Sequence, residues 1–329
     1  MAPFISVIIP NRNGAATLAT CLEAVLASAY DRFEVVVVDD CSTDGSADLI
    51  QKYPCRLIRL DRHGGAAKAR NVGAAHSRGD LLFFTDADCV VEKDTLAAAA
   101  RAMAGAGHTA IVGGTYTPKP YDPGFFSLFQ SVFINYSETK HQADPDYLAT
   151  HALVMTREGF AAAGGFPENF LPILEDVAFC HALKKRGYKL RLDPAILVRH
   201  IFNYSLCRSL ANGIRKAKFW TLYSLRHRDL TADSGTASIE LKSNVIALFL
   251  LLPLLAAARL AAHPWPLLPA ALVLGANLFV NRHLLRAFYR TAGPGGMTGL
   301  FFYYILVYPF AVAIGAGLGI LLFVAHRYR

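Results

Sequence analysis

Two aspartates two positions apart, Asp86 and Asp88, follow closely on the apolar run Leu81–Phe84. Such a run is typical of a buried strand, so both aspartates are expected at its carboxyl end, where open α/β sheets bind ligands. Neighbouring carboxylates are costly to leave uncompensated, and a divalent cation neutralises them. The pair therefore predicts a Mg²⁺ or Mn²⁺ site that holds a diphosphate in turn. The same spacing also fits solvated loop residues or helix caps, since short motifs often match by chance.

Polar residues also end two other predicted strands, over residues 4–10 and 33–38. The residues at or just after these two strand ends are Pro10, Asn11, Arg12, Asp39 and Asp40. Apolar residues at helical spacing separate the strands, as in residues 15–27, so strands and helices alternate. This alternation predicts an α/β fold with a mostly parallel sheet, whose strand ends meet at one edge. Acidic groups at that edge suit recognition of a base N–H and of a metal.

Two phosphate-binding sequences are missing. No G-x-G-x-x-G follows the first predicted strand, and there is no Walker A sequence. A glycine-rich cradle for phosphates is therefore not expected. The six cysteines show no C-x-x-C or zinc spacing, which is typical of reduced thiols that serve mostly in packing.

Composition divides the chain into two parts. Its 329 residues are 53% hydrophobic, and the mean hydropathy of +0.31 is high for a wholly soluble protein. The excess lies in three apolar segments, at 243–262, 265–281 and 300–325. Each has close to the ~20 residues that cross a bilayer core, so each is a candidate transmembrane helix. Pro309 could kink the last segment or split it into a re-entrant pair, so the number of crossings stays open.

Positive charge gathers beside the apolar segments. The formal net charge is +8, and residues 199–228 hold seven Lys or Arg and no Asp or Glu. A loop expected at 282–290 holds three more arginines, and the positive-inside rule puts both stretches on the cytosolic side. Apolar residues between the cations of 204–230 predict an interfacial helix on membrane lipids. No nucleic-acid partner is expected, because the basic residues flank membrane segments rather than a nucleic-acid module.

Several motifs occur in order along the first 200 residues. They are S-V-I-I-P at 6–10, V-V-V-D-D-C-S-T-D-G at 36–45, K-x-R-N-x-G at 68–73, T-D-A-D at 85–88, and G-G-F-P-E at 164–168 followed by L-E-D-V-A-F at 174–179. Together they resemble the enzymes of glycosyltransferase family 2, which have a GT-A fold. The resemblance covers about residues 4–201, and it implies a Rossmann-like catalytic domain with a nucleotide-sugar donor.

The resemblance implies roles for four residues toward the nucleotide. Asp40, preceded by Asp39, matches the aspartate that accepts from the base N–H, and a carboxylate can read the N3–H of uracil. A UDP-sugar is therefore the favoured donor. Lys68 and Arg70 lie on a predicted helix that faces the nucleotide in the family, although a solvated helix face explains Lys68 equally well.

The resemblance also implies the metal ligands and the base. Asp88 would be the direct ligand of Mg²⁺ or Mn²⁺, Asp86 would contact the ribose or the metal, and His200 matches a histidine near the metal or diphosphate. A lone histidine is as often structural. Asp176 would take the proton from the acceptor hydroxyl as it attacks the anomeric carbon with inversion. Glu175 and Asp176 also suit a helix N-terminus, and both roles are compatible.

These features predict a membrane-anchored, inverting, metal-dependent glycosyltransferase that acts on a lipid-linked or membrane-associated acceptor. A base such as Asp176 favours a hydroxyl acceptor over a polyprenyl phosphate, which is already a nucleophile. In the family that this chain resembles, members that make long polymers usually carry a Q-x-x-R-W segment after the E-D pair. This chain lacks one, so the resemblance argues against a processive polysaccharide synthase. That synthase, a polyprenyl-phosphate glycosyltransferase and a non-catalytic nucleotide-sugar-binding scaffold remain the alternatives.

The expected organisation is a catalytic domain at 1–203, an interfacial helix and linker at 204–230, and a transmembrane region at 243–325. No secretory pattern is visible at the N-terminus, so the catalytic domain is expected in the cytosol, on a multi-pass protein of the plasma membrane. Acceptor recognition is expected from residues 113–155, which carry no readable motif.

Overall fold

A computed structural model describes residues 2–260 and 263–327. The chain forms two compact units, which are described separately below. The first comprises Met1–Pro123 and Glu138–Asn203, and the second comprises Gly124–Ser137 and Tyr204–Arg329. The segment 124–137 thus belongs with the C-terminal part of the chain, although it lies inside the sequence of the first unit.

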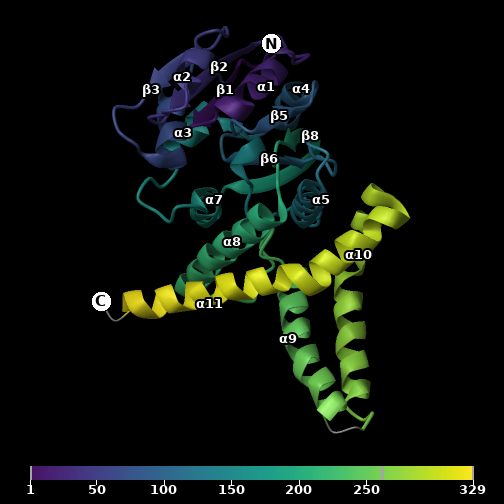
Figure 1. Ribbon diagram of the computed structural model, residues 1–329. Coiled ribbons are helices and arrows are strands. Elements are labelled where there is room, and N and C mark those ends of the chain that lie inside the picture. Colours follow the sequence, from purple (N-terminus) through teal and green to yellow (C-terminus); the bar gives the residue numbers. More distant parts are fainter. Residues whose placement is uncertain (1, 261–262, 328–329) are drawn as a thin grey trace. The chain divides into compact units, whose positions relative to one another are not determined.

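The first unit is built on one eight-stranded sheet with the spatial order β3-β2-β1-β4-β7-β6-β8-β5 (Figure 1). The strands are β1 (Ile5–Asn11), β2 (Phe33–Asp39), β3 (Arg56–Arg59), β4 (Leu81–Phe84), β5 (Cys89–Val91), β6 (Ala110–Tyr116), β7 (Leu153–Thr156) and β8 (Lys189–His200). The predicted α/β fold class is confirmed, and the parallel pairs are β3–β2, β2–β1, β1–β4 and β6–β8.

The parallel half of the sheet brings three strand ends together. β1 and β4 are buried along almost their whole length, which suits strands covered on both faces. In the register of β1, Asn11 lies opposite Asp39 of β2, and Ile8 lies opposite Phe84 of β4. The polar residues that follow these strands therefore share one edge of the sheet, as the sequence predicts.

The other half of the sheet is mixed. β7 pairs antiparallel with both β4 and β6, and β5 pairs antiparallel with β8. In the last pair, His200 at the end of β8 lies opposite Cys89, the residue after Asp88. This register brings the end of β8 beside the D-x-D sequence.

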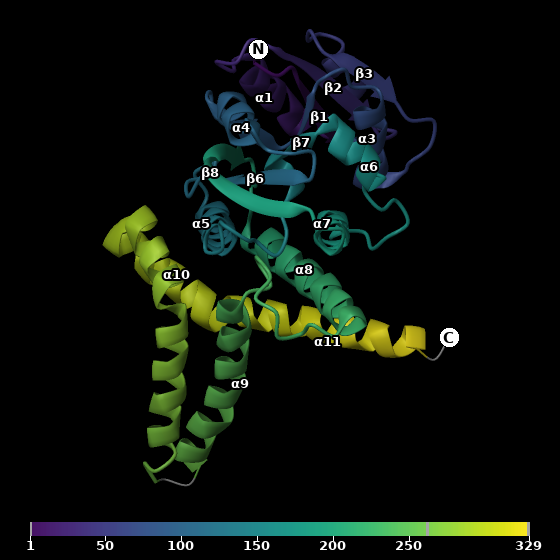
Figure 2. The ribbon, with the colours of Figure 1, turned by 180° about the vertical axis from the view of Figure 1, so that it is seen from behind.

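Helices cover both faces of the sheet, with α1 and α4 on one side and α3 and α6 on the other (Figure 2). The helices of this unit are α1 (Ala15–Leu26), α2 (Ser46–Ile50), α3 (Gly65–Ala75), α4 (Thr95–Met103), α6 (Arg157–Ala163) and α7 (Glu175–Lys185), with a 3₁₀ turn η1 (Thr150–Ala152). α2 is a short helix of five residues. Its start is set by Asp44, whose carboxylate accepts from the N–H groups of Ala15 and Ser46 and so links two loops.

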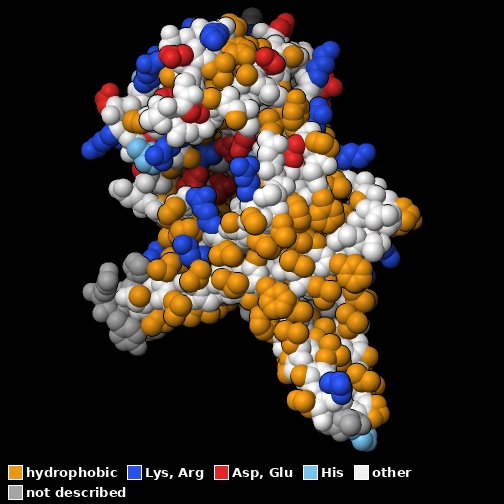
Figure 3. All heavy atoms as spheres, viewed as in Figure 1, with side chains coloured by type: hydrophobic (Ala, Val, Ile, Leu, Met, Phe, Trp, Pro, Cys, Tyr) orange, Lys and Arg blue, Asp and Glu red, His pale blue; other side chains and the backbone are white. Residues whose placement is uncertain are grey.

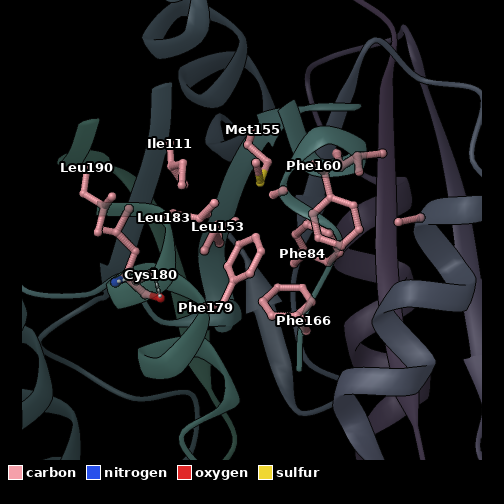
Figure 4. Close-up of a cluster of buried hydrophobic side chains, with 14 of the residues drawn as sticks. Phe84, Ile111, Leu153, Met155, Phe160, Phe166, Phe179, Cys180, Leu183 and Leu190 are labelled. Atoms are coloured by element: carbon pink, nitrogen blue, oxygen red, sulfur yellow. Dashed lines mark hydrogen bonds between the residues drawn. The ribbon is translucent and has the colours of Figure 1, made fainter. Parts of the chain in front are cut away.

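A cluster of aromatic side chains fixes α6 and α7 to the sheet (Figure 4). Phe84 of β4 meets Phe166 edge to face, with ring centroids 5.2 Å apart, and Phe166 lies 4.5 Å from Phe179 of α7. Asn71 of α3 fastens the same loop, because its side chain bonds both the N–H and the C=O of Phe166. The core thus holds the start of α7 close to the end of β4.

The second unit is helical. Its elements are α5 (Phe125–Thr139, whose last two residues belong to the first unit), α8 (Leu206–His227), α9 (Ile239–Leu260), α10 (Leu267–Phe302), the π-helix η2 (Tyr303–Val307) and α11 (Tyr308–Arg327). Two helical stretches are long and apolar enough to cross a membrane: α9 and the stretch Leu267–Ala325, which contains a kink. Ala261 and Ala262, at the end of the first apolar segment, lie outside the described residues.

The second and third apolar segments belong to one helical stretch. The loop predicted at 282–290 is wrong, because α10 continues through it. The helix breaks instead at Gly293, whose φ of 68° and ψ of −177° are non-helical, just before Pro294. Pro309 follows directly after the π-helix η2, and such an irregular turn accommodates a residue that has no N–H to donate.

Close helix packing joins α8 to α11. A Cβ added at Gly315 would lie 2.4 Å from the C=O oxygen of Ile214, and one at Gly319 would lie 2.5 Å from that of Lys218. Gly213 faces the ring of Tyr308 in the same way. These glycines let the two backbones approach, as small residues do in membrane helix pairs.

A buried polar network joins α9, α10 and η2. The Asn277 amide donates to Asn244 at 3.0 Å, and the Tyr304 hydroxyl donates to Asn281 at 2.7 Å. Asn281 also donates to the side chain of Asn277 at 2.9 Å. The Asn244 amide donates at 2.6 Å to the C=O of Tyr304, within the π-helix. Polar side chains thus link helices that are otherwise apolar.

Candidate active site at the carboxyl edge of the sheet

A buried arginine joins the D-x-D sequence to the E-D segment. Arg70 of α3 is 4% exposed, and its guanidinium donates to Asp86 at 2.6 Å and to Glu175 at 2.7 Å. Burial disfavours the charge on all three groups, but the two ion pairs compensate for it. Although burial alone would raise it, Arg70 holds the pKa of the Asp86 carboxyl below its usual range. We call these three residues the Asp86–Arg70–Glu175 chain.

Asp176 lies at the end of this chain, in the first turn of α7. Burial, reinforced by the neighbouring charge of Glu175, raises the pKa of the Asp176 carboxyl to about 6, and Arg70 opposes the shift. Its Oδ1 accepts from the N–H of Val177 at 2.8 Å. A carboxyl with such a pKa is ionised at neutral pH and still basic enough to accept a proton, which suits a general base.

Asp88 and His200 form a second group. His200 Nε2 lies 3.4 Å from Asp88 Oδ2, and Cys89 completes a set of ligand atoms within 4.8 Å of one another. Burial raises the pKa of the Cys89 thiol well above its usual value, so it stays protonated. The carboxylate fits Mg²⁺ or Mn²⁺, the imidazole suits a transition-metal ion better than Mg²⁺, and a neutral thiol fits neither. Asp86 is not part of this set. Its carboxylate accepts a hydrogen bond from Arg70 instead.

The metal role of Asp88 leads to a first prediction. Asp88→Asn should weaken Mn²⁺ binding at least about tenfold. Loss of a residue that only supports a metal ligand already costs about 10–100-fold in affinity, and Asp88 is itself the charged ligand. Electron paramagnetic resonance of free Mn²⁺, titrated with nucleoside diphosphate present, measures the affinity. Asp94→Asn removes an exposed carboxylate nearby in sequence and should change nothing. Equal affinity in the two variants would contradict the assignment.

Asn11 and Asp39 form a buried pair at the ends of β1 and β2. The Asn11 amide donates to Asp39 at 2.8 Å and to the Ser42 hydroxyl at 3.1 Å. The other oxygen of Asp39 accepts from the N–H of Ser42 at 3.2 Å. Pro10 precedes this pair and is half-buried. In the structure, therefore, Asp39 holds the loop after β2.

Asp40 holds the loop before α3. Its two oxygens accept from the N–H groups of Gly64 and Gly65, at 2.7 and 2.8 Å, and from His63 Nδ1 at 2.7 Å. His63 Nε2 in turn lies 2.7 Å from the guanidinium of exposed Arg12. A carboxylate has about four acceptor positions, so Asp40 retains capacity for one further donor. Lys68 is half-buried on α3, with its stem over Gly64.

The sequence motifs do not predict a buried ion pair between His151 and Glu138. His151 is 5% exposed, with Nε2 at 3.5 Å from Glu138, and its ring stacks on Tyr116 at 4.0 Å. Burial opposes protonation, but Glu138, followed by Asp86 and Asp176, raises the pKa of His151 overall. Thr115 also donates to Glu138, at 2.7 Å. Both ionic residues fall in or beside stretches without a motif, so only their contacts reveal them.

The geometry thus gathers most of the predicted site residues at one edge of the sheet. Acidic side chains are visible together in a recess of the space-filling view (Figure 3). The direct contacts form three groups: the Asp86–Arg70–Glu175 chain beside Asp176, the Asp88–His200 pair, and the loops held by Asp39 and Asp40. Such an edge can hold a charged ligand and remove a proton.

Known proteins resemble this chain in sequence over its first unit. Residues 6–159 match the family described as "Glycosyl transferase family 2". Glycosyltransferase AglE of Haloferax volcanii is 29% identical over 205 residues, which span 60% of this chain and 67% of that protein. The putative teichuronic acid biosynthesis glycosyltransferase TuaG of Bacillus subtilis is 34% identical over 99 residues, 29% of this chain. The chain spans only 39% of TuaG.

A solved structure shares the fold. The mannosyltransferase PcManGT of Pyrobaculum calidifontis, in complex with GDP-Man and Mn²⁺, superposes with a TM-score of 0.57 at 20% identity. The superposition covers 98% of this chain and 88% of PcManGT. At this identity, the likeness establishes the fold alone.

Proposed function

We propose that the chain, whose residues 6–159 match glycosyltransferase family 2, transfers a sugar, with inversion, from a nucleotide sugar to an acceptor hydroxyl on a lipid-linked or membrane-associated molecule. The observation that carries the proposal is the Asp86–Arg70–Glu175 chain. It connects the end of β4, where the donor would bind, to the start of α7, where the proposed base Asp176 lies.

The donor would bind at the ends of β1, β2 and β4. Asp40 keeps one acceptor position for a base N–H, and a UDP-sugar is favoured because uracil offers such a donor at N3. Pro10, Asn11 and Arg12 would line the nucleotide, with Lys68 beside it. Asp88 and His200 would hold Mg²⁺ or Mn²⁺, and this ion would stabilise the charge that grows on the leaving diphosphate.

Asp176 would act on the acceptor. Its carboxylate would accept the hydroxyl proton while the hydroxyl oxygen forms a bond to the anomeric carbon, and the bond to the diphosphate oxygen breaks on the opposite face. Arg70 would keep Asp86 and Glu175 ionised and fixed in place during this step. Attack from the face opposite the leaving group accounts for inversion.

The second unit supports the proposal of a membrane-borne acceptor. Two stretches in it are long and apolar enough to cross a bilayer, and the basic helix α8 suits anionic headgroups. We therefore place the protein in the plasma membrane, as a multi-pass protein with its catalytic unit in the cytosol. A polyprenyl phosphate acceptor is less favoured, because a phosphate oxygen needs no base such as Asp176.

The proposal is tested with membranes that contain the full chain. They are incubated with Mn²⁺ and a panel of radiolabelled UDP- and GDP-sugars, and the lipid phase is extracted. Label from one UDP-sugar is expected in that phase, and membranes with Asp176→Asn provide the background. Donor binding without any transfer would favour the scaffold alternative, and label in long polymers would favour the processive synthase.

A further inference from the structure

The second unit contains a cavity of about 540 Å³. Its walls come from α5, α8, α9, α11 and the segment between α8 and α9. Small-molecule sites measure about 300–1,000 Å³, so the cavity is large enough for a ligand. The proposed transfer chemistry uses none of the residues that line it.

Most residues that line this cavity are apolar, and two are lysines. Phe133, Trp220 and Val312 are among its apolar residues, and Lys216 and Lys242 are its two charged residues. Lys242 donates to the C=O of Ala232 at 2.5 Å, which fixes the amine at the start of α9. Among the described residues that line the cavity there is no Asp or Glu. An anionic ligand with an apolar body complements such a surface.

The rim of the cavity is exposed and hydrophobic. Leu230, Ile246 and Ile320 line it and are 48%, 60% and 48% exposed, respectively. Ile246 and Ile320 lie on the two stretches that are apolar enough to cross a membrane. A ligand would therefore enter from the lipid phase rather than from water, since apolar rims of this kind are costly to hydrate.

We propose that this cavity binds an anionic glycerophospholipid, with an acyl chain against its apolar walls and the phosphate beside Lys216 and Lys242. Free phosphate would not use the apolar walls, and a zwitterionic headgroup carries no net charge to complement the two lysines. The site goes beyond the proposed transfer reaction and does not depend on it. Its occupant would stabilise the packing of α8, α9 and α11.

The test measures lipid retention by the full chain, purified in a neutral detergent. Native mass spectrometry follows binding of phosphatidylglycerol, of phosphatidylcholine with the same chains, and of a long-chain isoprenyl phosphate, each with and without inorganic phosphate. Lys216→Gln and Lys242→Gln test the charge, and Lys218→Gln on the same helix is the control. Ala316→Trp fills the cavity from α11, and Ile314→Trp places the same indole outside it.

We expect phosphatidylglycerol to bind in preference to phosphatidylcholine and to resist competition by inorganic phosphate. Each cavity lysine variant should weaken that binding about fivefold, and the Lys218 variant should not. Ala316→Trp should remove binding, while Ile314→Trp retains it. Equal retention of both phospholipids, displacement by inorganic phosphate, stronger binding of the isoprenyl phosphate, or binding that survives Ala316→Trp would each overturn the proposal. Melting curves confirm that each variant is folded.

Discussion

Replacement of Arg70 by methionine is expected to lower the free energy of unfolding by about 3–5 kcal/mol, the cost of leaving buried partner charges without their counterion. Asp86 and Glu175 have side chains only 31% and 17% exposed, and each bonds the guanidinium directly. Methionine fills a similar volume but donates no hydrogen bond. Denaturant unfolding followed by circular dichroism measures the loss.

Two further variants make this prediction specific. Arg78→Met removes the partner of Glu34, but the Arg78 side chain is 75% exposed, so the loss should stay below about 1 kcal/mol. Glu175→Gln added to Arg70→Met should restore part of the stability, because one unpaired charge is then removed. If Arg70→Met and Arg78→Met are equally mild, the chain of ion pairs does not stabilise this edge of the sheet.

Asp176→Asn should reduce transfer by about 10²–10⁴-fold, the usual contribution of general base catalysis, because the amide cannot accept the proton. Its oxygen can still accept from the N–H of Val177, so the start of α7 should keep its structure. Nucleotide affinity, measured by calorimetry, should be unchanged. Asp144→Asn, at a carboxylate 78% exposed, serves as the control and should retain full activity.

The raised pKa of Asp176 also predicts a pH dependence. Transfer should rise with pH through about 6, as the carboxyl loses its proton and becomes a base. In the unfolded chain, the same group ionises near its usual value of 3.8, so between these two values the folded state binds more protons. Its contribution to stability therefore falls as pH rises through this window.

The pH dependence of stability distinguishes a catalytic role of Asp176 from a structural one. Asparagine carries no charge to bury, so Asp176→Asn should be more stable than the parent at pH 8, by on the order of 1–2 kcal/mol, and should show little difference at pH 4. Denaturant unfolding at the two pH values gives the comparison. An inactive variant that is also destabilised at pH 8 would point to a structural role for Asp176 instead of a catalytic one.

Local pattern was enough to predict the edge of the sheet. Apolar runs that end in Asp39–Asp40 and Asp86 identify strands and their carboxyl ends. A parallel strand that is buried on both faces appears in the sequence as a nearly continuous apolar run. The partner of Asp86 was not predictable in this way. Arg70 and Glu175 are brought together by packing of Phe166 between α3 and α7, which depends on the tertiary fold.

The sequence prediction for residues 282–290 was wrong because it took a group of charged residues as the sign of a loop. Three arginines in residues 282–290 suggested a loop between membrane segments, but they are spaced four apart and so share one face of a helix. Leucine and alanine between them favour the helix, which ends only where glycine and proline adjoin. The pair His151 and Glu138 left no pattern at all, because a contact between distant segments has no period in the sequence.

The bond from Asn244 to the carbonyl of Tyr304 has a consequence for biogenesis. If α9 and α10 enter the membrane as a hairpin while synthesis continues, the Asn244 amide has no carbonyl partner in η2 until residue 304 leaves the ribosome. Unsatisfied amides in hydrocarbon are costly, so the early hairpin would be less stable than the complete set of helices. Translation past the π-helix would end that vulnerable interval, and truncation before it would prolong it.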